Sequence, residues 1–309
     1  MAEQTFSREQ SSTHNVTFMG TSLGQPPLPA WLRAKTGKAR QTAPTAGIIK
    51  DLNIVTVCEE ARCPNIGECW NNKTATFMIC GEKCTRACAF CNIATARPDA
   101  LDPFEPARVA QAAKRLGLKY VVITSVDRDD LPDGGSEHWV KTIRAVRREL
   151  PEVGLEILTP DFKGQSEQYL RVAAERPDVY NHNIETVPRL YNVARRGSKY
   201  ERSLKLLQDV KNFDANIKTK SGLMTGLGET MDEIVDVMKD LRAHGVDFLT
   251  IGQYLRPTPR HLAVQKYYHP DEFAELKTIG DEMGFSLVAS GPFVRSSYHA
   301  GEDFHSAAK

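Results

Sequence analysis

The stretch that decides the fold runs from residue 76 to residue 91 and reads TFMICGEKCTRACAFC. Its first five residues are apolar or β-branched and predict a buried strand, Thr76–Cys80. Cys84, Cys88 and Cys91 follow in the loop directly after that strand. Gaps of three and then two residues let one loop wrap around a cubane cluster and bring three thiolates to three of its irons. Ligands of parallel α/β folds bind at the carboxyl ends of strands, so we expect a metal centre in this loop.

Strand and helix patterns alternate downstream of this loop and predict an α/β fold. Six strand–helix units with short connections imply parallel strands, and they are too few for an eight-unit barrel. The sequence therefore predicts a partial (βα)6 barrel, with Ser136 as the cap of one helix, Gly117 and Gly245 just past the ends of two others, and a short strand near Phe285–Ala289 at one edge. The further strands are expected at Tyr120–Ser125, Leu155–Thr159, Val179–Ile184, Ile217–Leu223 and Phe248–Tyr254, and the helices at 105–117, 136–150, 165–175, 200–212, 230–244 and 271–283.

Composition excludes several classes of protein. The chain has 309 residues with 40 Lys and Arg against 39 Asp and Glu, a formal net charge of +1. Such a balance argues against nucleic-acid binding by bulk electrostatics. No apolar run has the length of a membrane span and no signal peptide opens the chain, so we expect a soluble, cytoplasmic protein with no membrane partner. All seven cysteines lie between Cys58 and Cys91, and that clustering indicates metal ligation rather than a disulfide scaffold.

The chain divides into four predicted segments. Residues 1–45 are rich in polar residues, Gly and Pro and are expected to form a flexible arm, with Pro29–Leu32 as a stretch able to dock on the body. The arm's basic bias weakly resembles an organelle transit peptide, but its acidic residues favour a plain bacterial arm. Residues 46–75 carry an auxiliary metal site, residues 76–290 form the barrel, and residues 291–309 form a C-terminal extension.

A second cysteine triad precedes the barrel. Cys58, Cys63 and Cys69 are separated by four and five residues and have no local fourth ligand. Structural zinc requires four tetrahedral ligands, so an auxiliary iron–sulfur cluster is the sharper interpretation of this triad. Cys80 fits neither spacing and is expected to be a buried free thiol.

The first triad resembles the motif of the radical S-adenosylmethionine (radical SAM) superfamily, Cys-x-x-x-Cys-x-aromatic-Cys, with Phe90 as the aromatic residue. The resemblance implies a 4Fe–4S cluster on Cys84, Cys88 and Cys91 whose open iron chelates S-adenosylmethionine. An electron from the cluster then cleaves the sulfonium to a 5′-deoxyadenosyl radical.

The second triad, in its context VCEEARCPN (residues 57–65), resembles the lipoyl synthases, as do RSSY (residues 295–298) and most of the chain after the arm. That family's second serine ligates the auxiliary 4Fe–4S cluster, and it corresponds to Ser297. An oxygen is a harder ligand than sulfur, so we hypothesise that the iron ligated by Ser297 is the labile corner of the auxiliary cluster. Without the resemblance, Ser296 and Ser297 are typical of two loop hydroxyls in local turns.

Polar residues at the ends of the predicted strands are candidates for binding S-adenosylmethionine. Asp127 is explained nearly as well by a salt-bridged loop. Gly226-Leu-Gly228-Glu229 indicates either a simple turn or a close backbone approach to the cofactor, and His182 is expected to be structural. The candidate contacts are Phe90, Thr124, Ser125, Asp127, Asn183, Glu185 and Lys220.

The resemblance implies insertion of two sulfur atoms, at C6 and C8 of an octanoyl chain that is amide-linked to a lysine of a lipoyl carrier, with the auxiliary cluster consumed as the sulfur source. Implied partners are the octanoylated lipoyl domains of 2-oxoacid dehydrogenases, the glycine cleavage H protein, an electron donor such as ferredoxin or flavodoxin, and an iron–sulfur carrier that rebuilds the cluster. Alternatives are another radical sulfur inserter, biotin synthase-like or a methylthiotransferase, and a non-catalytic zinc or iron–sulfur carrier. Two basic clusters are solvated faces or a docking site for an acidic carrier: Arg195, Arg196, Lys199 and Arg202, and Lys141, Arg144, Arg147 and Arg148.

Overall fold

The computed structural model describes residues 27–33, 39–72 and 74–307, and the main sheet within them has eight strands. Seven strands are parallel, and the short first strand runs antiparallel to its neighbour at one edge. The predicted partial barrel is confirmed. In spatial order the strands are β1 (Val55–Thr56), β2 (Thr76–Ile79), β5 (Tyr120–Ser125), β6 (Gly154–Leu158), β7 (Val179–Asn181), β8 (Lys218–Thr225), β9 (Phe248–Gln253) and β10 (Leu287–Gly291).

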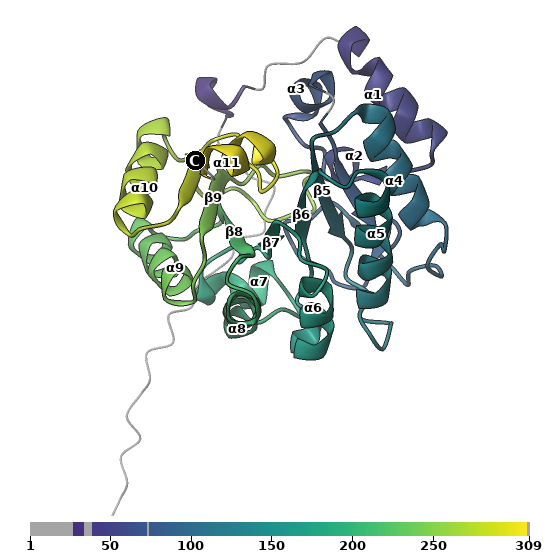
Figure 1. Cartoon of the computed structure of the whole chain (residues 1–309). Helices are drawn as coiled ribbons and strands as arrows, with labels where there is room; N and C mark the ends of the chain where they lie inside the picture. The colour runs from purple at the N-terminus through teal and green to yellow at the C-terminus, as the bar shows by residue number, and fades with distance from the viewer. Residues whose placement is uncertain (1–26, 34–38, 73, 308–309) are drawn as a thin grey trace, which may run out of the picture.

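Amphipathic helices form the outer layer of the curved sheet (Figure 1). Their apolar faces supply much of the core, as α4 does with Val109, Ala112 and Leu116. Gly117 ends α4 in the left-handed conformation, φ 67°, as predicted. The outer helices are α4 (Glu105–Leu116), α5 (Ser136–Glu149), α6 (Ser166–Ala173), α8 (Tyr200–Phe213), α9 (Met231–Ala243) and α10 (Pro270–Glu282), and the short α7 (Tyr191–Ala194) precedes α8.

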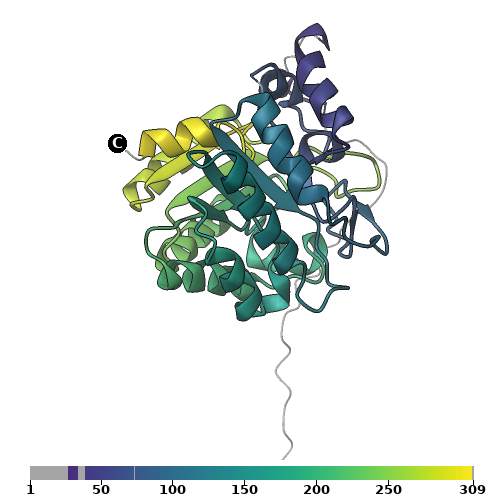
Figure 2. The same cartoon turned by 45° about the vertical axis from the view of Figure 1, so that its right-hand side comes forward.

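Chain segments before and after the barrel contribute smaller elements. Helices α1 (Ala39–Asp51), α2 (Val57–Glu60) and α3 (Ile66–Asn71) precede β2, and α11 (Ala300–Ala307) follows the tail that crosses from β10. Figure 2 shows α1 lying beside α4. The two-residue strands β3 (Lys83–Cys84) and β4 (Ala94–Thr95) pair with each other and bracket the first cysteine loop.

Three details differ from the sequence-based expectations. Helix α1 begins inside the segment expected to be a flexible arm, because Thr45 is buried and its hydroxyl donates to the Trp70 carbonyl at 2.8 Å. Ser136 is the first residue of α5 rather than its cap, since Gly135 occupies the cap position. Strand β7 ends at Asn181, three residues early, because the His182 side chain turns away to bond Thr159 and Ser203.

The docking stretch of the arm is ordered where it is described. Leu32 is buried, and the Trp31 ring lies 4.9 Å from the ring of His269, next to the start of α10. Most of the rest of the predicted arm lies outside the described residues. No helix in the described part of the chain is long and apolar enough to cross a membrane.

Candidate active site

The first cysteine loop is tied to the carboxyl edge of the barrel by backbone hydrogen bonds. Thr85 donates its N–H to the Asp127 carbonyl at 3.1 Å, and Ala89 donates to the Ala194 carbonyl at 2.9 Å. A ring nitrogen of His261 lies 3.0 Å from the carbonyl oxygen of Cys91. The loop is thus held from three sides, as a site that must keep one geometry requires.

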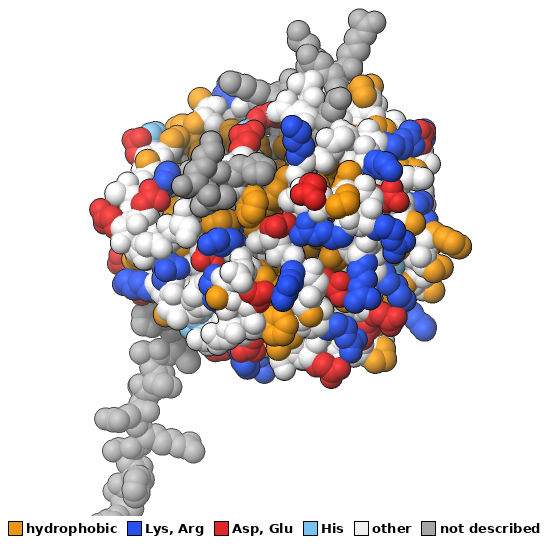
Figure 3. All heavy atoms as spheres, viewed as in Figure 1, with side chains coloured by type: hydrophobic (Ala, Val, Ile, Leu, Met, Phe, Trp, Pro, Cys, Tyr) orange, Lys and Arg blue, Asp and Glu red, His pale blue; other side chains and the backbone are white. Residues whose placement is uncertain are grey.

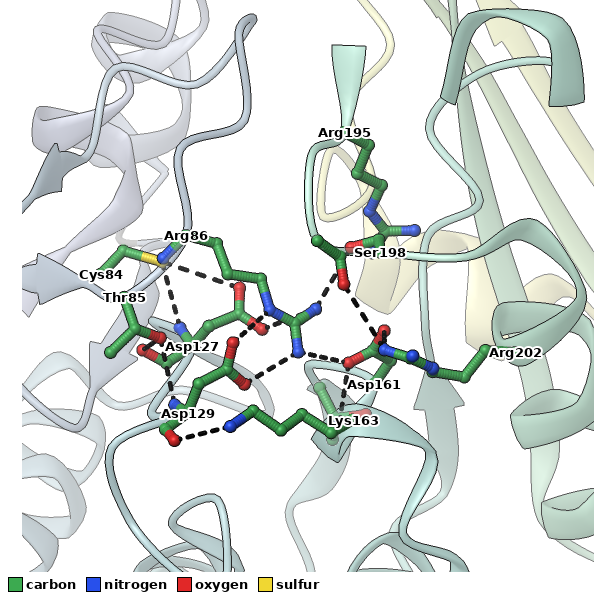
Figure 4. Close-up of polar contacts among 12 residues, drawn as sticks. Cys84, Thr85, Arg86, Asp127, Asp129, Asp161, Lys163, Arg195, Ser198 and Arg202 are labelled. Carbon is green, nitrogen blue, oxygen red and sulfur yellow. Dashed lines mark hydrogen bonds and ion pairs between the residues drawn. The ribbon is translucent and has the colours of Figure 1, made fainter. Parts of the chain in front are cut away.

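A buried arginine inside this loop provides its strongest anchor (Figure 4). The Arg86 guanidinium donates to both carboxylate oxygens of Asp129, at 2.7 and 2.9 Å, and to Asp161 at 2.6 Å. It also lies 3.3 Å from Asp127, and only 4% of its side chain is exposed. The three carboxylates follow β5 and β6, so one side chain joins the cysteine loop to two strand ends.

All three thiols of the first triad have a raised pKa. Burial raises the pKa of Cys84 to about 11, of Cys88 to about 12 and of Cys91 to about 11, so the free thiols are protonated at neutral pH. Backbone N–H groups of Arg86 and Asp127 already point at the Cys84 sulfur, each at 3.4 Å. Three soft sulfur donors, with backbone donors around one of them, fit an iron–sulfur cluster and lose their protons when it binds.

The second triad lies beside the C-terminal tail, more than 220 residues away in sequence. One small hollow is lined by all three of its thiols together with Ser297. Asn65 donates to the Phe293 carbonyl at 2.8 Å, and Tyr298 donates to Glu68 at 3.0 Å, so the tail is joined to the segment that carries the triad. The other residues lining the hollow are Asn65, Ile66, Thr74, Ala75, Thr76, Arg295 and Tyr298.

The groups that line this hollow include three thiols and the Ser297 hydroxyl. Burial raises the pKa of Cys58 to about 11 and that of Cys69 to about 12. Within the described residues, no three His, Cys, Asp or Glu side chains lie close enough together to hold a single metal ion. A four-iron cluster is a larger group that takes one ligand at each corner, and three thiolates with one oxygen match that requirement.

Residues expected to contact S-adenosylmethionine are placed differently from one another. The Ser125 hydroxyl, at the carboxyl end of β5, is buried and has no partner among the described residues, as an atom awaiting a ligand would. Thr124 donates to the Leu158 carbonyl at 3.0 Å, and Asp127 lies beside Cys84, with burial raising its pKa. Phe90 packs against the hydrophobic core.

Asn183 and Glu185 lie together after β7. The Asn183 amide donates to Glu185 at 3.1 Å and to the Ser296 hydroxyl at 2.8 Å, which ties the tail to this strand end. Lys220 is the third residue of β8, within the strand that the sequence predicts. Its ammonium forms a buried ion pair with Glu156 at 2.9 Å.

Arg195 is the residue that charge patterning placed wrongly. It does not belong to a solvated basic face, because its guanidinium donates to the Asn183 carbonyl at 2.7 Å and to the hydroxyl of Tyr191 at 3.1 Å. From there its positive charge opposes the effect of burial on the pKa values of Cys88 and Glu185. Arg195 directly follows the short helix α7, in the connection between β7 and α8.

The second basic cluster does form a solvated face. Its side chains on α5 are interspersed with acidic groups, as the right-hand side of Figure 3 shows. Lys141 pairs with Glu137 at 2.9 Å and Arg144 pairs with Glu175 at 2.7 Å. These pairs leave little uncompensated charge there for an acidic partner.

Two other expected structural roles are visible in the structure. Cys80 is 2% exposed and packs in the core as a free thiol. Both ring nitrogens of His182 are engaged, with Thr159 at 2.8 Å and Ser203 at 2.9 Å, and burial lowers its pKa to about 3. His182 is therefore neutral and structural.

The glycine-rich segment after β8 is a turn closed by its own side chain. The Glu229 carboxylate accepts hydrogen bonds from the N–H groups of Gly226 and Leu227. A Cβ at Gly226 would collide with the Gln253 side chain and the Lys266 carbonyl, and φ there is 99°. The glycine is needed for that close approach within the protein.

A parallel partial barrel with three cysteines in the loop after its first barrel strand defines a class of enzymes. Residues 78–241 match the family model of the Radical SAM superfamily, and the chain belongs to that superfamily. Solved structures agree on the fold. The chain is similar to Streptococcus suis SuiB bound to precursor peptide SuiA (TM-score 0.53, 14% identity, 84% of this chain, 54% of the other). It is also similar to methylornithine synthase (PylB; TM-score 0.51, 14% identity, 84% of this chain, 80% of the other). The chain thus spans about half the length of the SuiB chain.

A sequence relative narrows the class. The lipoyl synthase of Rubrobacter xylanophilus (strain DSM 9941 / JCM 11954 / NBRC 16129 / PRD-1) is 57% identical over 279 residues, which are 90% of this chain and 87% of the relative. The chain therefore belongs to the lipoyl synthase family, and it is a radical SAM sulfurtransferase that uses a 4Fe–4S cluster and S-adenosylmethionine.

Proposed function

We propose that this enzyme inserts two sulfur atoms, at C6 and C8, into an octanoyl chain amide-linked to a lysine of a lipoyl carrier protein. The observation that supports this most directly is the hollow shared by Cys58, Cys63, Cys69 and Ser297. It provides a second cluster site, which an enzyme that both makes radicals and donates sulfur needs. Family membership supports a lipoyl carrier as the substrate.

In this proposal Cys84, Cys88 and Cys91 hold the first cluster, and the second triad with Ser297 holds an auxiliary one. When bound, the first cluster supplies the electron that cleaves S-adenosylmethionine, and the auxiliary cluster supplies sulfur. Unactivated C–H bonds require a radical to break them, and a misplaced primary radical would attack the protein. The task of the chain is therefore to hold both sites rigidly and to keep water out.

Individual residues then have distinct tasks. Arg86 keeps the first loop on the barrel edge, and Ser125, at the carboxyl end of β5, has a buried hydroxyl without a partner that is available to S-adenosylmethionine in this proposal. The cationic Arg195, beside Cys88 and Glu185, compensates negative charge that accumulates when thiolates form. We add Arg195 to the proposed cofactor-binding residues, together with Thr124, Asp127, Asn183 and Glu185. Lys220, paired with Glu156, has a structural role in the barrel interior.

Two further partners complete the proposed cycle. An electron donor such as ferredoxin or flavodoxin reduces the first cluster, and an iron–sulfur carrier rebuilds the auxiliary one after each product. The electron donor must reach the first cysteine triad, and the iron–sulfur carrier must reach the second.

The test is anaerobic. The protein is reconstituted with iron and sulfide, mixed with S-adenosylmethionine, dithionite and an octanoyl-lysine peptide, and the products are followed by mass spectrometry. We expect a peptide that has gained two sulfur atoms, together with 5′-deoxyadenosine and methionine.

The matched control replaces Cys58, Cys63 and Cys69 by alanine and leaves the first triad intact. This variant should still form 5′-deoxyadenosine while the peptide gains no sulfur. Sulfur insertion at the wild-type rate by that variant would show that the second triad is not the sulfur source.

A further inference from the structure

Thr76 makes a side-chain contact that the proposed chemistry does not use. Its hydroxyl lies 2.8 Å from the Ser297 hydroxyl, across 221 residues of sequence. Thr76 is 4% exposed, and both residues line the hollow of the second triad. Two hydroxyls in contact beside three thiols are thus part of one polar arrangement.

Thr76 is held rigidly on its side of this contact. It is the first residue of β2, which pairs with β1 on one side and β5 on the other. Threonine is β-branched, so few χ1 rotamers are open to it. Its hydroxyl therefore has a fixed direction, unlike that of a loop serine.

The tail is held just as firmly on the other side. Ser296 exchanges hydrogen bonds with the Asn183 side chain at 2.8 and 3.0 Å, so its hydroxyl is already engaged away from the hollow. Tyr298 donates its backbone N–H to the Arg295 carbonyl and its hydroxyl to Glu68. Ser297 lies between these two anchors and faces Thr76.

We propose that Thr76 is a positioning residue that donates a hydrogen bond to the Ser297 oxygen while that oxygen ligates the auxiliary cluster. This inference depends on the proposed function, in which Ser297 is the fourth ligand. An oxygen bound to iron has given up its hydrogen and only accepts, so Thr76 is the donor of the pair. Hydrogen bonds to a negatively charged oxygen are shorter and stronger than neutral ones.

The Thr76 hydrogen bond would therefore control how long the iron ligated by Ser297 stays in the auxiliary cluster. The hydrogen bond stabilises the ligated serine, because it spreads the negative charge that otherwise resides on one oxygen. Replacing Thr76 by Val keeps the shape and removes the donor. Release of iron from that corner should then become about tenfold faster or more.

The experiment measures iron release rather than turnover. The full chain carries alanine at Cys84, Cys88 and Cys91, so that all bound iron belongs to the second site. After reconstitution, the rate of iron transfer to a ferrous chelator is followed by absorbance in this parent and in variants with Thr76→Val, Thr76→Ser and Ser297→Ala.

Thr76→Val should lose iron about tenfold faster than the parent, whereas Thr76→Ser, which keeps the hydroxyl, should match the parent. A Thr76→Val rate within twofold of the parent, while Ser297→Ala releases iron faster, overturns the role of Thr76 alone. Equal rates in the parent and Ser297→Ala overturn the ligand assignment as well. Circular dichroism of the Thr76→Val protein separates a lost hydrogen bond from a lost fold: the proposal requires faster iron release with the spectrum of the parent, and faster release together with a changed spectrum overturns it.

Discussion

Arg86 is expected to be among the most sensitive residues outside the cysteines. We predict that Arg86→Met lowers the free energy of unfolding by about 3 kcal/mol. The change leaves Asp129 without its two hydrogen bonds and Asp161 with fewer partners, and the Asp161 side chain is completely buried. Breaking a buried ion pair from one side costs about 3–5 kcal/mol.

The low end of that range applies here for two reasons. Asp127 and Asp129 are 21% and 24% exposed, so water can replace part of what the guanidinium supplies. Arg202 stays 3.1 Å from Asp161 and continues to compensate its charge. Arg86→Lys keeps the positive charge but loses the bidentate contact with Asp129, and should lower the free energy of unfolding by about half as much as Arg86→Met.

The assay is urea unfolding of the cluster-free protein, with cluster content after reconstitution as the second readout. Arg115→Met is the matched control, because Arg115 pairs with Asp51 at 3.1 Å on the exposed surface and should lose less than about 1 kcal/mol. An Arg86→Met protein that unfolds like the wild type and binds a full complement of iron would refute the reasoning.

Three further predictions follow from single contacts. Burial lowers the pKa of His182 to about 3, so the unfolded state binds the proton first as pH falls, and the free energy of unfolding should fall by about 1 kcal/mol between pH 6.5 and pH 5.5. The His182→Asn protein should lose this pH dependence in urea unfolding, and an unchanged dependence in that variant would contradict the prediction. A Cβ at Gly222 would lie 2.9 Å from the Ser296 hydroxyl, so Gly222→Ala should destabilise the protein by about 1–3 kcal/mol in urea and loosen the tail, whereas a wild-type midpoint would show that the site adapts. Arg196 is exposed and follows α7 near the first cysteine loop, so Arg196→Glu should slow modification of an acidic carrier at low salt, and Arg148→Glu on α5 should not; equal effects in a steady-state assay would exclude that docking face.

Local sequence signals were sufficient for the barrel. Buried parallel strands are near-continuous apolar runs, so β5 and β9 were predicted to within one residue at each end. Strand β7 was predicted too long because the sequence continues to the apolar Ile184, and only the His182 contacts show where the chain turns.

The side-chain arrangement at the strand ends was less predictable. Arg86 and Arg195 look like ordinary charges in sequence, and their roles depend on carboxylates and carbonyls from other loops. Lys220 was expected to contact the cofactor, and its partner Glu156, on a different strand, explains why a lysine is tolerated inside the barrel. The meeting of the second triad with Ser297 carries no local signal, and it was expected only from family resemblance.

The contacts of the tail also bear on the order of events during synthesis. Asn65 meets Phe293, and Thr76 meets Ser297, at sequence separations of 228 and 221 residues. Chains fold from the N-terminus as they emerge from the ribosome, so strands β2 to β9 are available well before the residues that complete the second hollow, and β10 directly precedes them. Closing so long a loop is entropically unfavourable and slow, so we expect this hollow to form late in folding. A nascent chain that stalls before Phe293 has its barrel sequence complete and all seven cysteines in place, yet it lacks the residue proposed to close the second site.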